Sequence, residues 1–193
     1  MTTDWKCGEP VKENLMVLAQ PVKALPFDVD KGLVQDITSS IDIGAVAKSL
    51  QGKNEKEAYE ALEELGQKLM KLTIELADTK YMDRTGEMVE RVAKQTGISF
   101  PHRLERYVEL SILGLRPTDR WNISKATTKE LVLQVSGCTV QKALQEADIK
   151  GLPCKGFCFA SFKAAAERTG DRITTEMSRA LPQDSMCEFH ISV

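Results

Sequence analysis

The chain has 193 residues, of which 42% are hydrophobic and 28% charged, and a net charge of −2. This length suits one domain of moderate size with its own core, and the composition excludes a disordered or membrane protein. The small net charge, with Lys and Arg scattered among Glu and Asp, predicts no nucleic-acid partner. The sequence has no run of 18 apolar residues and no basic-then-apolar signal-peptide layout at its start, so we expect a cytoplasmic protein without a membrane partner.

The first part of the chain has helical periodicity. Residues 1–30 contain three prolines and little periodicity, which predicts an irregular lead-in. Apolar residues at helical spacing over residues 32–50 predict one or two helices, with Asp42 near a cap or a break. Further helices are expected around Met88 and from Pro101 to Gly114.

The clearest helix runs from about Asn54 to Lys80. Its apolar positions alternate spacings of four and three residues and therefore lie on one face: Ala58, Leu62, Leu65, Leu69, Leu72 and Leu76. This stripe is interpreted either as the core-facing side of the helix or as part of a homodimer interface.

After Pro117 the spacing of apolar residues changes from the helical period of 3.6 residues to the strand period of 2 residues. Residues 121–127 and 129–135 predict two strands in a hairpin. Helices are expected at 139–147 and 154–168, followed by a third strand through Ile173, Thr175 and Met177 and a fourth through Cys187 to Val193. Helices followed by such strands predict an α+β fold with a four-stranded antiparallel sheet. We expect a helical region over 1–115, packed as one unit with an α+β, cysteine-containing ligand-binding region over 116–193.

Four of the five cysteines lie in the second region. Cys154 and Cys158 are one helical turn apart, which places both sulfurs on one helix face. Cys138 at the end of a strand and Cys187 at the start of another are placed where they can approach that face. Four thiolates suit zinc or an iron–sulfur cluster. The alternative is four small buried hydrophobic side chains.

The sequence from about Leu110 to Val193 resembles the 4-vinyl-reductase-type small-molecule-binding domains and the related L-2-amino-thiazoline-4-carboxylate hydrolase-like proteins. The segments that carry the resemblance are CKGFCFASF at 154–162, RITTE at 172–176 and CEFHI at 187–191. It implies a small organic ligand and a zinc site that combines an upstream Cys with the pattern Glu-x2-Cys-x7-Cys. Glu176 and Cys187 match that pattern, Cys154 is the natural upstream thiol, and Arg179 departs from it.

Three functions follow from these observations. The first is a protein that binds a small molecule and a metal, zinc or an iron–sulfur cluster, through Cys138, Cys154, Cys158, Glu176 and Cys187. The second is a hydrolase that opens a small heterocycle such as an amino-thiazoline carboxylate, by attack of a cysteine thiolate or of metal-activated water, with Cys187 and Glu176 as catalytic residues. The third is a dimeric interaction protein without a ligand.

Overall fold

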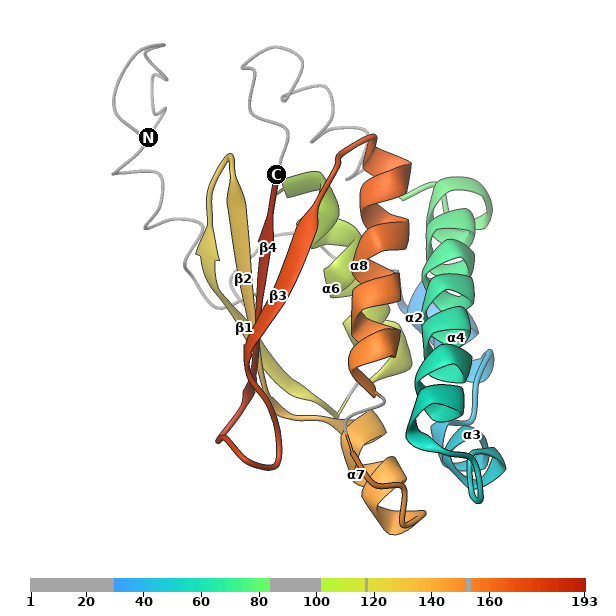
Figure 1. The fold of residues 1–193 in the computed structure, drawn as a ribbon. Helices are drawn as coiled ribbons and strands as arrows, with labels where there is room; N and C mark the ends of the chain where they lie inside the picture. Colours follow the sequence, from blue (N-terminus) through green and yellow to red (C-terminus); the bar gives the residue numbers. More distant parts are fainter. Residues whose placement is uncertain (1–29, 84–101, 117, 152–153) are drawn as a thin grey trace, which may run out of the picture.

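The computed structural model describes residues 30–83, 102–116, 118–151 and 154–193 (Figure 1). The fold is α+β, as predicted, with helices followed by a four-stranded antiparallel sheet and its accompanying helices. Among the described residues, no helix is both long enough and apolar enough to cross a membrane. Except for Asp30, the expected lead-in lies outside the described residues, and so does the segment around Met88 where a helix is expected.

The periodic segment at the start of the described chain, for which one or two helices were predicted, forms two short helices. Helix α2 spans Lys31–Ser39 and begins after Asp30, whose carboxylate accepts the Gly32 N–H at 2.7 Å. Helix α3 spans Ile43–Ser49 and begins after Asp42, the residue predicted as a cap or break. Both carboxylates pair with N–H groups that have no partner inside the helix.

The long predicted helix is α4, Glu55–Glu75, extended by the π-helical turn η2, Leu76–Lys80. A capping box fixes its start: the Glu57 N–H donates to Asn54 at 3.0 Å, and the Asn54 N–H donates to Glu57 at 3.1 Å. The apolar stripe packs inside this one chain, against helix α8. Its most buried members are Ala58, Leu62 and Leu69.

The sheet is formed by two hairpins joined side by side. Its strands are β1 (Arg120–Ala126), β2 (Glu130–Gly137), β3 (Thr174–Arg179) and β4 (Cys187–Ser192). Their order in space is β1-β2-β4-β3, and all neighbours are antiparallel. The last strand therefore lies between β2 and β3, where Cys187 is paired with Val135.

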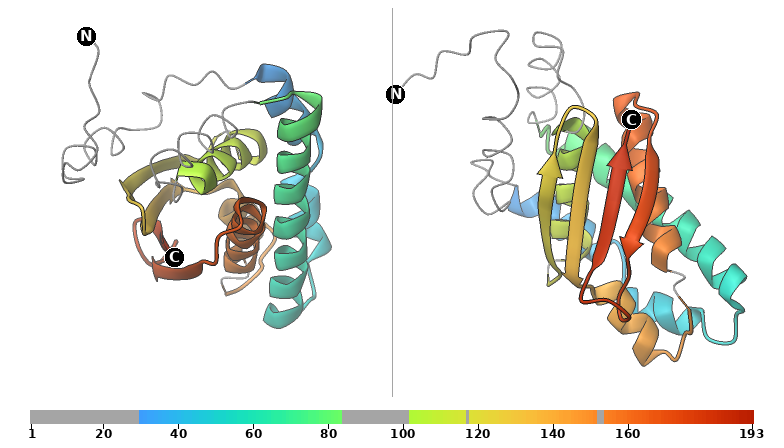
Figure 2. Two further views of the ribbon diagram at one scale, coloured as in Figure 1. Left: turned by 90° about the horizontal axis from the view of Figure 1, so that it is seen from above. Right: turned by 60° about the vertical axis from the view of Figure 1, so that its left-hand side comes forward.

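The described elements form three layers (Figures 1 and 2). Helices α6 (His102–Leu115) and α8 (Cys154–Thr169) cover one face of the sheet, and α4 lies behind α8. Helix α7 (Thr139–Glu146) lies at one end of the sheet and leads from β2 toward α8. Most side chains of α8 are buried, because the sheet packs on one of its sides and α4 on another.

Close packing at two places fixes the position of α8. Phe189 on the inner face of the sheet makes edge-to-face contacts with Phe159 and Phe162, with ring centroids 6.1 and 5.3 Å away. On the other side, a Cβ added at Gly66 of α4 would lie only 2.2 Å from the Phe157 carbonyl oxygen. Only glycine allows the two helices to approach this closely, and α8 thereby presents its first turns to the end of the sheet.

Candidate functional site

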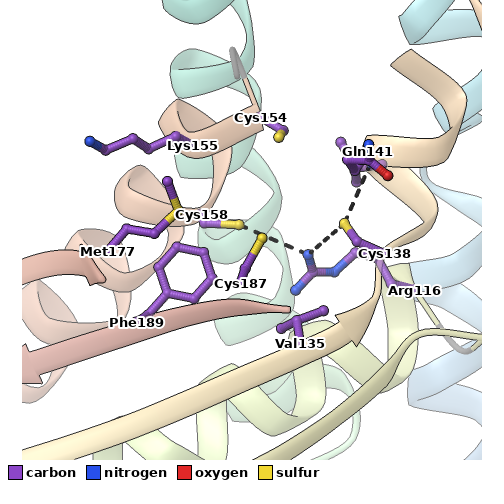
Figure 3. Close-up of a pocket in the computed structure, with 11 residues that line it drawn as sticks. Arg116, Val135, Cys138, Gln141, Cys154, Lys155, Cys158, Met177, Cys187 and Phe189 are labelled. Carbon is purple, nitrogen blue, oxygen red and sulfur yellow. Dashed lines mark hydrogen bonds between the residues drawn. The ribbon is translucent and has the colours of Figure 1, made fainter. Parts of the chain in front are cut away.

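The four cysteines of the described chain line one cavity (Figure 3). Cys138 directly follows β2, Cys154 and Cys158 occupy the first two turns of α8, and Cys187 opens β4. The central position of β4 in the sheet brings Cys187 beside the end of β2, and α8 supplies the other two thiols from above. All four are free thiols. The structure brings these four residues, which lie up to 49 positions apart in the sequence, to the walls of one cavity.

The cavity is large enough for a single ion or water molecule. Its volume is about 20 Å³, enough for a single water-sized sphere and far below the roughly 300 Å³ of pockets that enclose organic ligands. Besides the cysteines, its walls include Met177, Phe189 and the guanidinium of Arg116. The space is thus of ionic size, with sulfur on several sides.

Three of the four sulfurs receive N–H donors. The Gln141 N–H donates to the Cys138 sulfur at 3.4 Å, and the Leu181 N–H donates to the Cys187 sulfur at 3.4 Å. Nη1 of Arg116 lies 3.9 Å from the sulfurs of both Cys138 and Cys158. Cys138 is also the N-cap of α7, a position where a side chain normally offers oxygen to the first N–H groups of a helix. These donors stabilise negative charge on sulfur.

Arg116 carries a positive charge into the interior. Its side chain is 5% exposed, and its Nε lies 3.3 Å from Oδ2 of Asp119, whose side chain is fully buried. The other Asp119 oxygen accepts the N–H and the hydroxyl of Thr139, each at 2.6 Å. Burial alone would lower the pKa of Arg116, but the neighbouring Cys158, Cys138 and Asp119 raise it. The guanidinium therefore stays charged beside the sulfurs.

Burial holds three of the four thiols in the neutral form. Burial raises the pKa of the Cys154 and Cys187 thiols, and it raises that of Cys158 to about 12 even though Arg116 acts in the opposite direction. A thiol is a weak nucleophile unless it is ionised. The three cysteines are thus poorly suited to covalent catalysis, and a metal ion must displace their protons to bind them.

Glu176, predicted as a ligand or catalytic residue, is not brought to the cluster. It lies on β3 with its side chain exposed, whereas its neighbour Met177 lines the cavity. Successive side chains of a strand point to opposite faces, so Glu176 lies on the outer face of the sheet. Arg179, at the position where the related zinc pattern has a cysteine, is also exposed.

His190 lies on the outer face as well, because it alternates along β4 with the buried Phe189 and Ile191. Its Nδ1 lies 3.1 Å from Glu130 and its Nε2 lies 3.3 Å from Glu188. His190 therefore belongs to a carboxylate network on the far side of the sheet from the cysteines. For His102, nothing beyond its place in α6 is described, and Cys7 lies outside the described residues.

Sequence reasoning missed Arg116. The one signal for it is its spacing of three residues from Asp119 after an apolar helix, and that spacing is equally typical of a surface ion pair. Its position between two cysteine sulfurs becomes evident only when the end of α6 and the start of α7 are brought together. Arg116 is the group that links the thiol cluster to a buried charge network.

As the side chains stand, the described residues contain no group of three Cys, His, Asp or Glu side chains arranged to hold a metal ion. Cysteine sulfurs shift with rotation about a single bond, and four of them face one small space. The donor set therefore fits a thiophilic ion in its chemistry, and rotation of the thiols is needed to complete the ligand geometry.

Comparisons of the chain with protein-family models, curated proteins and solved structures give no match. The resemblance to the vinyl-reductase-type and thiazoline-hydrolase-like families stays a prediction from the motifs quoted above.

Proposed function

We propose that this protein binds a single zinc ion through Cys138, Cys154, Cys158 and Cys187. The observation that carries the proposal is the convergence of four thiols, from three separate segments, on one cavity of about 20 Å³. Zinc in structural sites takes four ligands in a tetrahedron, and four cysteines are a common set. Glu176, which the family resemblance added to the ligand set, has no place in this proposal because its side chain is exposed on β3.

The N–H donors around the sulfurs support the same assignment. A neutral thiol is a weak hydrogen-bond acceptor, so donors aimed at Cys138, Cys158 and Cys187 gain little from protonated sulfur. The same donors gain considerably more when a bound ion converts the sulfurs to thiolates. The buried charge of Arg116 then also faces a negative partner.

The size of the cavity favours one ion over an iron–sulfur cluster. Even the smallest common cluster holds two irons and two sulfides, which need more room than one water-sized sphere. Sulfur ligands also select zinc over magnesium or calcium, which prefer oxygen. We therefore assign zinc in preference to the cluster that the cysteine count alone left open.

The hydrolase alternative has less support. Its cysteine route requires an ionised thiol at Cys187 with Glu176 nearby, but burial raises the pKa of Cys187, and Glu176 lies on the opposite face of the sheet. The interaction-protein alternative relied on the apolar stripe of α4, which is packed against α8 within this chain.

Elemental analysis of anaerobically purified protein tests the proposal. We expect about one zinc per chain, and loss of most of it in Cys158→Ser, because hydroxyl oxygen is a poor replacement for thiolate. Cys7→Ser is the matched control and should keep its zinc, since four thiolates already complete a tetrahedral site. Circular dichroism of each variant establishes that the fold persists. Protein that carries no zinc, and takes up none from added zinc, would refute the assignment.

A further inference from the structure

A larger hollow lies directly outside the cysteine cavity. It has a volume of about 430 Å³ and is open to solvent, a size within the usual range of small-molecule pockets. Ile149 and Pro182 contribute apolar wall, and Lys150 and Glu55 contribute charged side chains of opposite sign. Cys154 and Gln141 line both this groove and the inner cavity, so they form the boundary between the two.

Cys154 differs from the other three cysteines of the described chain. It is the first residue of α8 and, like Cys138, is only partly buried, whereas Cys158 and Cys187 are each 9% exposed. Its sulfur receives none of the donors described above, which come from Gln141, Leu181 and Arg116 and point to the other three sulfurs. Among the four thiols of the described chain, Cys154 is thus the one whose sulfur receives none of these donors and the one that lines the open groove.

We propose that Cys154 is an exchangeable zinc ligand, and that the groove admits a small aliphatic thiol whose sulfur replaces Cys154 on the metal. The inference rests on the proposed zinc site and adds to it a ligand-binding function. Three protein ligands with an exchangeable fourth position are the pattern of zinc sites that meet an outside molecule. The groove supplies the space for that molecule, which the 20 Å³ inner cavity lacks.

The chemistry of the groove and of the site selects the ligand class. Three thiolates on one ion favour a fourth soft donor, so an incoming sulfur competes better than a carboxylate or an amine. The exchange is balanced without an oxidant: the incoming thiol gives up its proton and forms the zinc–sulfur bond, and the Cys154 thiolate leaves the metal and takes up a proton. Cys154 then needs only a side-chain rotation toward the groove.

The full chain loaded with cobalt(II), which reports sulfur ligands by charge-transfer absorption, tests the inference with 2-mercaptoethanol as the probe. Cys154→Ala should bind cobalt through three thiolates. Addition of 2-mercaptoethanol should raise its sulfur-to-cobalt absorption by about one third, to the wild-type value, because four bonds replace three. Cys158→Ala is the matched control and should show no such recovery, since Cys158 is buried and does not line the groove.

The outcomes separate the two proposals. Wild-type protein that binds neither cobalt nor zinc overturns the zinc site and the inference together. Wild-type protein that binds cobalt, combined with a Cys154→Ala variant that does not respond to the thiol, overturns the exchange and leaves the zinc site standing. Equal recovery in Cys154→Ala and Cys158→Ala also overturns it, because the response then does not depend on the groove. Cys154→Ser serves if the alanine variant does not fold.

Discussion

Replacement of Arg116 by Met tests whether the buried guanidinium stabilises the proposed zinc thiolates. Met keeps much of the side-chain length but removes the charge and the donor that lies 3.9 Å from the sulfurs of Cys138 and Cys158. Loss of a group that supports metal ligands from outside typically weakens binding 10- to 100-fold, or about 1.4–2.7 kcal/mol. Because 3.9 Å is long for a hydrogen bond, we expect about tenfold, the lower end of this range.

The assay is zinc affinity measured by competition with a chromophoric chelator. Arg172→Met, at an exposed position before β3, is the matched control and should bind zinc like the wild type. In Arg116→Met, the buried Asp119 carboxylate loses its ion-pair partner. The double variant Arg116→Met/Asp119→Asn removes this unpaired charge, and it should therefore bind zinc more tightly than Arg116→Met alone. An unchanged or higher affinity in Arg116→Met would refute the view that the guanidinium compensates thiolate charge.

Three further predictions concern the fold around the site. Gly66→Ala should lower the free energy of unfolding by about 1–3 kcal/mol, measured by urea denaturation, because the new methyl group collides with the Phe157 backbone; an unchanged stability would contradict the close helix contact. Phe189→Ala should cost about 3–5 kcal/mol in the same assay, and a loss below 1 kcal/mol would mean that its ring is not in the core. His190→Gln should remove a pH-dependent contribution: Glu130 raises the pKa of His190 in the folded protein, so the histidine stabilises most below about pH 6.5 and progressively less as the pH rises through the raised pKa. Denaturation curves across this interval measure it, and a difference between the two proteins that does not vary with pH contradicts it.

Much of the fold could be predicted because local signals agree with the tertiary structure. Asn54 and Glu57 form the capping box that starts α4, and the apolar stripe of that helix follows the helical period. The alternation of Cys187, Phe189 and Ile191 fixed the inner face of β4, and these three residues are buried. Each of these signals depends on residues close in the sequence.

The candidate site could be predicted only in part, because its geometry depends on contacts between distant segments. The spacing of Cys154 and Cys158 on one helix face was a local signal, but the approach of Cys187 depends on the insertion of β4 between β2 and β3. Arg116 gave no usable signal, since the sequence does not show that its charge is buried. For Glu176 the family pattern favoured a ligand role, whereas alternation along the strand places it on the outer face, beside His190 in the register.

The central claim is that four cysteine sulfurs hold one zinc ion, and X-ray absorption at the zinc edge of the purified, zinc-loaded protein in thiol-free buffer tests it most directly. We predict a shell of four sulfurs at about 2.3 Å, with the sulfur number reduced in Cys158→Ser. A shell dominated by nitrogen or oxygen at about 2.0–2.1 Å would contradict the account, because the cavity among Cys138, Cys154, Cys158 and Cys187 would then not be the place where zinc binds.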